Sequence, residues 1–169
     1  MKKNSGFTLL ELLITVALIS IVFAIAIPSM TTFTQNDRLT TNINTLIGHL
    51  AYARSEAVKL SQQVSICISS NTTSCTGGNW QDGWIVYIDA DGSNTFTAGE
   101  QVLRAQQALD GANTLTTAVG TQVTYDYRGF VTAASVGSFL LCDARSGAFG
   151  KTIRISTTGR VRVEDGSAC

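Results

Sequence analysis

The stretch Gly6–Met30, GFTLLELLITVALISIVFAIAIPSM, decides how the rest of this chain must be arranged, and its only charged side chain is Glu11. A helix of about 20 apolar residues spans a lipid bilayer, and the apolar run 7–27 is long enough for that. Lys2 and Lys3 precede the run, and positive charges favour the cytoplasmic side of a membrane. We therefore expect a cytoplasmic N-terminus and an exported remainder.

Glu11 distinguishes this segment from an ordinary secretory signal peptide. A signal peptide has a shorter apolar core followed by a small-residue cleavage site, whereas here the run continues straight into a helical pattern. A carboxylate inside a membrane segment is costly, and it therefore indicates a function. A simple anchor gains nothing from Glu11, but a helix that pairs its carboxylate with a neighbouring chain does.

This segment resembles the N-terminal signature of type IV pilins and pseudopilins. A short basic leader ends in Gly6, Phe7 follows, Glu11 comes soon after, and Pro28 stands near the end of the apolar run. The resemblance implies cleavage between Gly6 and Phe7 by prepilin peptidase and N-methylation of Phe7. It also implies that Glu11 pairs with the N-terminal amine of a neighbouring pilin during assembly at the inner membrane. A plain signal anchor is the alternative.

Beyond Pro28 the chain keeps a helical pattern and then changes to strands. Apolar residues recur at helical spacing, which predicts one buried face, at Ile43, Leu46, Ile47, Leu50, Ala53, Ala57 and Val58. From Gln62 onward, short apolar stretches between Gly- and Thr-rich turns predict an antiparallel β-sheet, in QVSICIS, GWIVYID, QVLRAQ, VTYDY, SFLLCD, TIRIS and RVRVE. A helix packed on such a sheet is an α+β architecture, and the resemblance implies the type IV pilin fold. We expect a leader at 1–6, a transmembrane and assembly half of the helix at 7–30, an amphipathic half at 31–61, and a β-rich globular domain at 62–169.

The composition excludes several classes of protein. The chain has 12 basic and 12 acidic side chains and no formal net charge, which argues against a generally basic nucleic-acid-binding protein but leaves room for a local basic patch. The sequence has no nucleophile elbow, metal-ligand spacing or phosphate loop, and its single histidine, His49, has no visible catalytic partner. We therefore expect no enzyme, no cofactor and no metal.

Four cysteines indicate disulfides rather than a zinc site. Cys67, Cys75, Cys142 and Cys169 permit three pairings and contain no CxxC motif. Disulfides suit an exported domain. We favour Cys67 with Cys75, which closes a short polar loop, and Cys142 with Cys169, which ties residue 169 to a strand.

The acidic stretch DADGSNTFTAGE, residues 89–100, has part of the spacing of a calcium-binding EF-hand loop. Its glycine is fourth rather than sixth, however, and its flanks are predicted strands rather than helices. We favour a polar hairpin loop, with calcium binding as the alternative.

The C-terminal region concentrates positive charge. Five basic residues and no acidic one lie between positions 144 and 163: Arg145, Lys151, Arg154, Arg160 and Arg162. The strand alternation in KTIRISTTGRVRVED predicts a hairpin that brings Arg154, Arg160 and Arg162 together, and Gly159 permits a close approach or an unusual dihedral. Guanidinium groups bind phosphate bidentately, whereas no aromatic series accompanies them to indicate base stacking. A solvated strand face is the alternative.

Two further stretches, residues 50–69 and 80–104, resemble the GspH/FimT group of minor pilins and pseudopilins. The resemblance weakens between residues 108 and 138. GRVR resembles the GRxR motif of FimT-type pilins that bind DNA in natural transformation, and it maps onto Gly159, Arg160 and Arg162, with Lys151 and Arg154 as supporting charges. This implies double-stranded DNA as a partner, together with other pilins. The alternative is a structural minor pilin or pseudopilin that primes assembly without binding DNA.

Overall fold

The computed structural model describes residues 7–169, which divide into two units between Asp37 and Arg38. Helix α1, Leu9–Leu60, begins in the first unit and ends in the second. In the first unit its side chains are almost all exposed, and an 18-residue window has a mean hydropathy of 2.7. This part of α1 is long and apolar enough to cross a membrane, and the helix continues through Pro28 without a break.

In the second unit one face of α1 is apolar and is buried against residues of the β-strands. Its buried residues are Leu39, Ile43, Leu46, Leu50, Ala53 and Ala57. The buried face therefore follows the predicted spacing and begins earlier, at Leu39. The expectation for Val58 was wrong, since half of this side chain is exposed.

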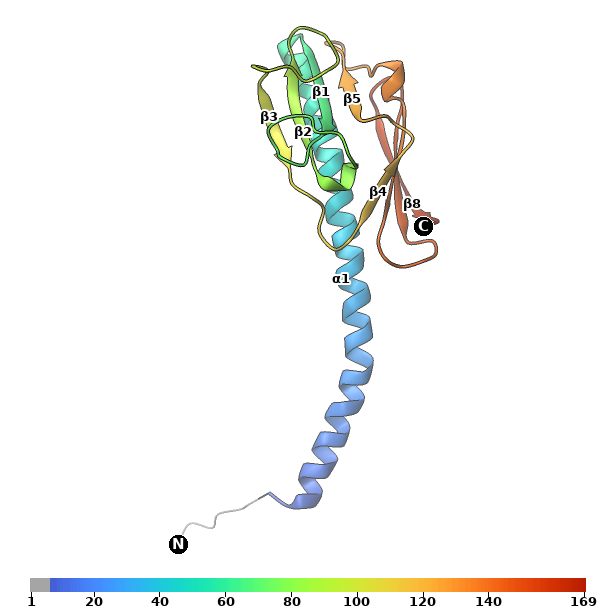
Figure 1. Ribbon diagram of the computed structural model, residues 1–169. Helices are drawn as coiled ribbons and strands as arrows, with labels where there is room; N and C mark the ends of the chain where they lie inside the picture. The colour runs from blue at the N-terminus through green and yellow to red at the C-terminus, as the bar shows by residue number, and fades with distance from the viewer. Residues whose placement is uncertain (1–6) are drawn as a thin grey trace. The chain divides into compact units, whose positions relative to one another are not determined.

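Two antiparallel four-stranded sheets form the rest of the domain (Figure 1). The first has the order β3-β2-β1-β5, with β1 Gln63–Ile68, β2 Trp84–Asp89, β3 Val102–Gln106 and β5 Gln122–Tyr125. The second has the order β4-β6-β7-β8, with β4 Thr114–Thr117, β6 Gly137–Cys142, β7 Gly150–Ile155 and β8 Val161–Ser167. Two short 3₁₀ helices, η1 Trp80–Asp82 and η2 Ala133–Ser135, lie in the connections.

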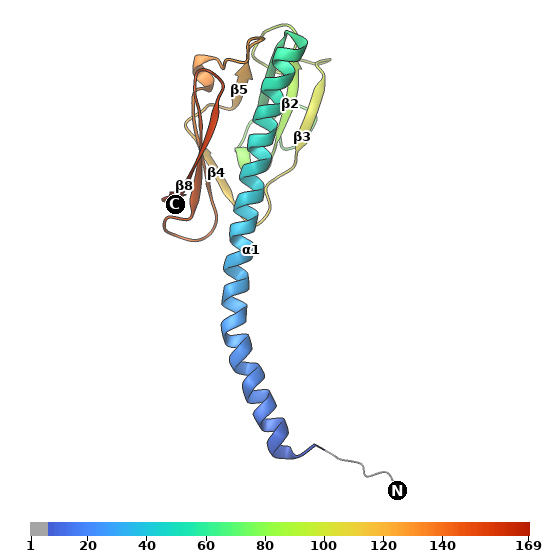
Figure 2. The same ribbon diagram turned by 180° about the vertical axis from the view of Figure 1, so that it is seen from behind.

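A single large apolar cluster joins α1 to both sheets. Figure 2 shows α1 in front of the sheet that contains β2, with β3 to one side of the helix. The rings of Trp80, Trp84 and Phe139 meet in this core, with ring centroids 6.5 Å apart for Trp80–Trp84 and 5.0 Å apart for Trp80–Phe139. Trp84 Nε1 donates a hydrogen bond of 2.9 Å to His49 Nδ1, so the single histidine supports the packing of α1 on the sheet. This is the α+β arrangement expected from the sequence.

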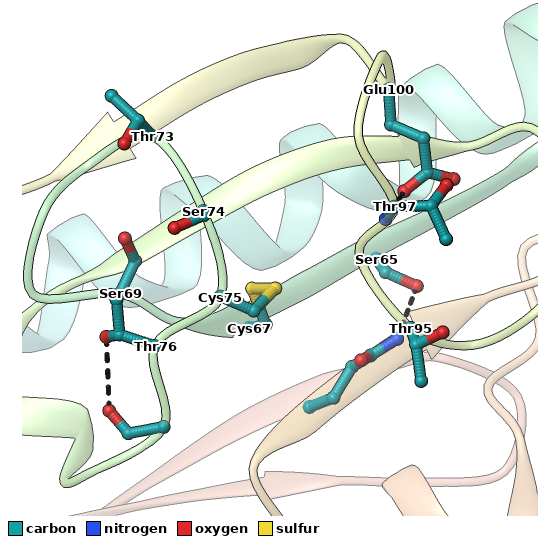
Figure 3. The surroundings of a disulfide bond; sticks show 12 residues. Ser65, Cys67, Ser69, Thr73, Ser74, Cys75, Thr76, Thr95, Thr97 and Glu100 are labelled. Carbon is teal, nitrogen blue, oxygen red and sulfur yellow. Dashed lines mark hydrogen bonds between the residues drawn. A yellow bond between two sulfur atoms is a disulfide. The ribbon is translucent and has the colours of Figure 1, made fainter.

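Two disulfides connect strands to loops. Cys67 of β1 bonds Cys75, and Cys142 of β6 bonds Cys169, which is the favoured pairing. Figure 3 shows the first disulfide among small hydroxyl side chains. In its loop, Asn71 Oδ1 accepts hydrogen bonds of 3.0 Å from the backbone N–H groups of Thr73 and Ser74.

The region that the resemblance covered weakly differs most from expectation. The stretch VTYDY was expected to be a strand, but β5 ends at Tyr125 and the chain turns at Asp126. The Asp126 carboxylate accepts backbone N–H groups from Arg128 and Phe130, which favours a turn over a continued strand. Strand β4 was not foreseen, because TLTT alternates one buried leucine with three exposed threonines.

Candidate nucleic-acid interface

The predicted basic hairpin exists and consists of β7, β8 and the turn Ser156–Arg160. Cross-strand pairing sets Arg154 opposite Arg162 and Ile155 opposite Val161. The Ser156 backbone N–H donates to the Arg160 carbonyl at 3.0 Å and closes the turn. Because Arg160 and Arg162 are two residues apart on an extended segment, they lie on the same face.

Two of the predicted cations are neutralised within the hairpin. Arg154 Nε lies 2.8 Å from Glu164 Oε1, and Lys151 Nζ lies 2.6 Å from Asp165 Oδ1. The hydrogen bond from Arg154 to Glu164 raises the pKa of Arg154. The run of five basic residues without an acid ends immediately before these two carboxylates. The hairpin is therefore less basic than that window alone indicates.

The side chains of Arg160 and Arg162 remain available to bind an anion. Both are exposed, and neither has an ion-pair partner among residues 7–169. The fifth predicted cation, Arg145, pairs with Asp143 and lies over the ring of Phe149, with Cζ 4.3 Å from the ring centroid. The hydrogen bond from Arg145 lowers the pKa of Asp143.

Gly159 fixes the shape of the turn. Its φ of +73° lies in the left-handed region, and its backbone is buried. A Cβ at this position would meet the Gly129 carbonyl oxygen, the Tyr125 ring at 3.1 Å and Arg54 Nε at 3.2 Å. Both predicted possibilities for Gly159, a close approach and an unusual dihedral, are therefore present.

Arg54 of α1 is a residue of this site that sequence reasoning missed. Its Nε donates to the Gly129 carbonyl and its Nη2 to the Thr158 carbonyl, both at 3.0 Å. It therefore joins the β7–β8 turn to the turn that follows β5. The sequence showed only a basic residue off the apolar face of a helix, which is the usual pattern of a solvated side chain.

A shallow groove of about 690 Å³ lies beside Arg160. Its lining combines apolar and basic side chains and includes no carboxylate: Ile47, Ala51, Arg54, Ser55, Val58, Lys59, Gly159, Arg160 and Val161. The surface next to Arg160 can therefore accept an anion without repulsion from its lining.

The carboxylates of the acidic loop, residues 89–100, accept hydrogen bonds from the backbone of the same loop. One carboxylate oxygen from each of Asp89, Asp91 and Glu100 lies within 4.8 Å of the other two. Asp89 accepts the N–H groups of Ser93 and Asn94, and Glu100 accepts those of Ala90 and Thr97. Burial raises the pKa of Asp89, and the nearby charge of Glu100 adds to this. These carboxylates close a polar hairpin loop, as the favoured interpretation expected.

Of the residues predicted for processing and assembly, Gly6 is outside the described residues. Phe7 precedes α1 and is exposed. Thr8 caps the helix, since its Oγ1 accepts the backbone N–H of Glu11 at 3.2 Å. Glu11 stands in the first turn, where the helix dipole favours a carboxylate.

Comparisons with known proteins agree with this architecture. The profile of the family described as type II transport protein GspH matches residues 42–159, and the prokaryotic N-terminal methylation motif matches residues 1–27. The GspH match ends at Gly159, so it does not include Arg160 or Arg162. No protein with a curated description matches the chain.

Two crystal structures of the type IV minor pilin FimU from Pseudomonas aeruginosa PAO1 are similar to the chain. The first has a TM-score of 0.61 at 22% sequence identity and covers 81% of this chain and 96% of its own. The second has a TM-score of 0.60 at 22% identity and covers 78% of this chain and 97% of its own. At this identity the similarity establishes the fold, a long N-terminal helix packed on antiparallel sheet.

Proposed function

Because this chain belongs to the GspH family and is a type IV minor pilin of the GspH/FimT kind, we propose that it binds extracellular double-stranded DNA for uptake in natural transformation. The apolar helix anchors it in the inner membrane, with the globular domain in the periplasm until assembly into a pilus. The methylation motif implies prepilin peptidase processing and contact with other pilins. We assign cleavage to the Gly6–Phe7 bond, methylation to Phe7 and the assembly contact to Glu11.

The observation that carries the DNA proposal is the pair Arg160 and Arg162, exposed and without ion-pair partners among the described residues. Guanidinium groups bind phosphate bidentately, and contacts with the phosphate backbone are independent of sequence. Gly159 and Arg54 support the proposal because they hold the turn in one conformation. Lys151 and Arg154 contribute less, since carboxylates of the same hairpin compete for them.

Single-subunit binding should be weak and dependent on salt. Each phosphate neutralised on duplex DNA contributes about −0.9 to the slope of log K against log salt, so two arginines give a slope of about −1.8. Four cations would give about −3.6. Several subunits in one pilus raise the avidity.

The test is a titration of the full-length protein in neutral detergent with duplex DNA at several salt concentrations. We expect Arg160→Ala/Arg162→Ala to abolish binding while the fold is retained, and Lys151→Ala/Arg154→Ala, the matched control, to weaken it only slightly. If the wild type does not bind, or if the Arg160→Ala/Arg162→Ala protein binds equally well, the proposal fails. The chain is then a structural minor pilin or pseudopilin that primes assembly, a role that the family match also supports.

A further inference from the structure

Two turns with the same local geometry lie side by side on this domain. Asp126–Gly129 follows β5, and Ser156–Gly159 joins β7 to β8. In each the glycine N–H donates to the carbonyl three residues earlier, at 2.9 Å in the first turn and 2.8 Å in the second. The two glycines have φ of +80° and +73°. The Val131 N–H, just after the first turn, donates to the carbonyl of Thr157 in the second turn at 3.1 Å. The chain that leaves the first turn therefore lies beside the second.

Arg54 holds the two turns together. Its guanidinium donates to Gly129 in one turn and to Thr158 in the other, both at 3.0 Å. The residue after each glycine, Phe130 or Arg160, therefore leaves its turn at an equivalent position. This brings the loop 126–130 beside the turn that immediately precedes Arg160, although the two segments are far apart in sequence.

The first turn presents two exposed aromatic rings. Tyr127 is 57% exposed and Phe130 is 46% exposed. Arg128 Cζ lies 5.4 Å from the Tyr127 ring centroid and 5.6 Å from that of Phe130. The two rings therefore flank one guanidinium.

Asp126 orders this group. Its Oδ2 accepts Arg128 Nε at 3.0 Å and Nη2 at 2.8 Å, and its Oδ1 accepts the backbone N–H groups of Arg128 and Phe130 at 2.9 Å. Because Asp126 neutralises Arg128, the turn adds no free cation, and its two partly exposed rings remain for a ligand on the sides away from Arg128. The loop is fixed before any ligand arrives, which lowers the entropy cost of binding.

We propose that this pair of turns binds single-stranded nucleic acid, with phosphates on Arg160 and Arg162 and unpaired bases stacked on Tyr127 and Phe130. Proteins that bind single strands combine positive charge along the backbone with aromatic side chains on which bases stack. A duplex offers the same phosphates, but its base faces are covered by their neighbours except at the ends. This inference rests on the proposed phosphate contact and adds to it a preference for unpaired bases.

The test uses three probes that separate phosphate from base. Full-length protein in detergent is titrated with an oligothymidine, with an abasic oligomer of the same length and with a duplex of the same length. Tyr127→Ala/Phe130→Ala is the variant. The matched control is Phe149→Ala, an exposed ring that also has an arginine over it but lies beside the opposite end of β7. Tyr127→Leu/Phe130→Leu keeps the apolar volume if the alanine variant fails to fold.

We expect the wild type to bind oligothymidine at least about five-fold more tightly than the abasic oligomer, the lower range for one stacked base. The aromatic double variants should lose this difference and keep the wild-type affinities for the abasic oligomer and the duplex. Phe149→Ala should keep the wild-type affinities for all three probes. If the wild type binds both single strands equally, or the double variants keep the difference, the stacking inference is wrong. A third outcome separates the two proposals. If Arg160→Ala/Arg162→Ala loses all binding and the aromatic variants change nothing, the DNA-binding function is supported and the stacking inference is wrong.

A second measurement reports on stacking directly. In Phe130→Trp, a base stacked on the new indole changes its fluorescence. Oligothymidine should quench this fluorescence and the abasic oligomer should not, and equal quenching by both would exclude stacking at this position.

Discussion

Arg54 Nη2 donates a hydrogen bond of 3.0 Å to the carbonyl oxygen of Thr158, although the two residues are 104 positions apart in the sequence. With the second bond, to Gly129, one helix side chain fixes the backbone that presents Arg160. The candidate site thus depends on a helix residue that lies outside the C-terminal hairpin.

Replacing Arg54 should loosen both turns. Hydrogen bonds from charged donors contribute roughly 1.5–3 kcal/mol each in favourable cases, and we expect Arg54→Ala to lower the free energy of unfolding by about 2 kcal/mol because one of its bonds is exposed. Thermal unfolding measures the change. Lys59→Ala, which breaks an exposed ion pair on the same helix, should cost under about 0.5 kcal/mol. Equal effects of the two variants would show that Arg54 does not clamp the turns.

Gly159→Ala should be among the most damaging single substitutions in the hairpin. The new Cβ meets the Gly129 carbonyl oxygen, and the backbone has a positive φ, so we expect a loss of more than about 2 kcal/mol. Gly120→Ala is the control, because a Cβ there meets no atom within 4 Å. Chemical denaturation compares the two. A stable Gly159→Ala protein with unchanged DNA binding would show that the turn tolerates a different geometry.

Removing a carboxylate should increase DNA affinity. Glu164→Gln breaks the pair with Arg154 and frees a third cation on the hairpin. Both side chains of this pair are more than half exposed, so stability should change by less than about 1 kcal/mol. The salt slope for duplex DNA should become steeper by about 0.9. An unchanged slope would place the bound DNA away from Arg154.

Acidification should weaken the packing of α1. Burial lowers the pKa of His49 below its ordinary value of 6.5, and the charge of Arg104 adds to this. The unfolded chain takes up this proton more readily than the folded one. The stabilisation is therefore complete above about pH 6.5 and is lost as the pH falls towards the lowered pKa.

This prediction is tested by the difference in Tm between about pH 7.5 and about pH 5, the range in which histidine titrates. The drop should be larger in the wild type than in His49→Gln, which cannot take up the proton. Since His49 is the only histidine, no other imidazole confuses the comparison. An identical drop in both proteins would mean that His49 has the same proton affinity in the folded and the unfolded chain.

The two disulfides should contribute unequally. The Cys142–Cys169 bond spans 27 residues and Cys67–Cys75 spans 8. Loop-closure entropy then predicts about 3.5 kcal/mol for the longer loop and about 2.5 kcal/mol for the shorter. Unfolding of Cys142→Ser/Cys169→Ser beside Cys67→Ser/Cys75→Ser measures this, and a reversed order would show that strain or local packing outweighs chain entropy.

Local sequence patterns predicted most of the helices, strands and disulfides. The helical spacing from Ile43 onward, the strand alternation of β7 and β8 and the cysteine pairing all depend on residues near one another or on simple geometry. The failures involve distant residues. Glu164 and Asp165 neutralise their partners only because of the β7–β8 register, and Arg54 meets Thr158 only through tertiary packing. Tyr127 and Phe130 were not associated with the arginines, since no local pattern links them to the C-terminal hairpin.

β8 is the edge strand of its sheet, and its outer backbone groups are open to pairing with another chain. Arg162, Glu164 and Asp165 put charges of both signs on this edge, and a bulge opposite Gly150 and Lys151 interrupts its regularity. Charged side chains and bulges discourage edge-to-edge aggregation. Arg162, which we assign to ligand capture, therefore also helps to keep this edge from pairing with a second chain. Replacing it with an apolar residue would weaken both properties of the strand at once.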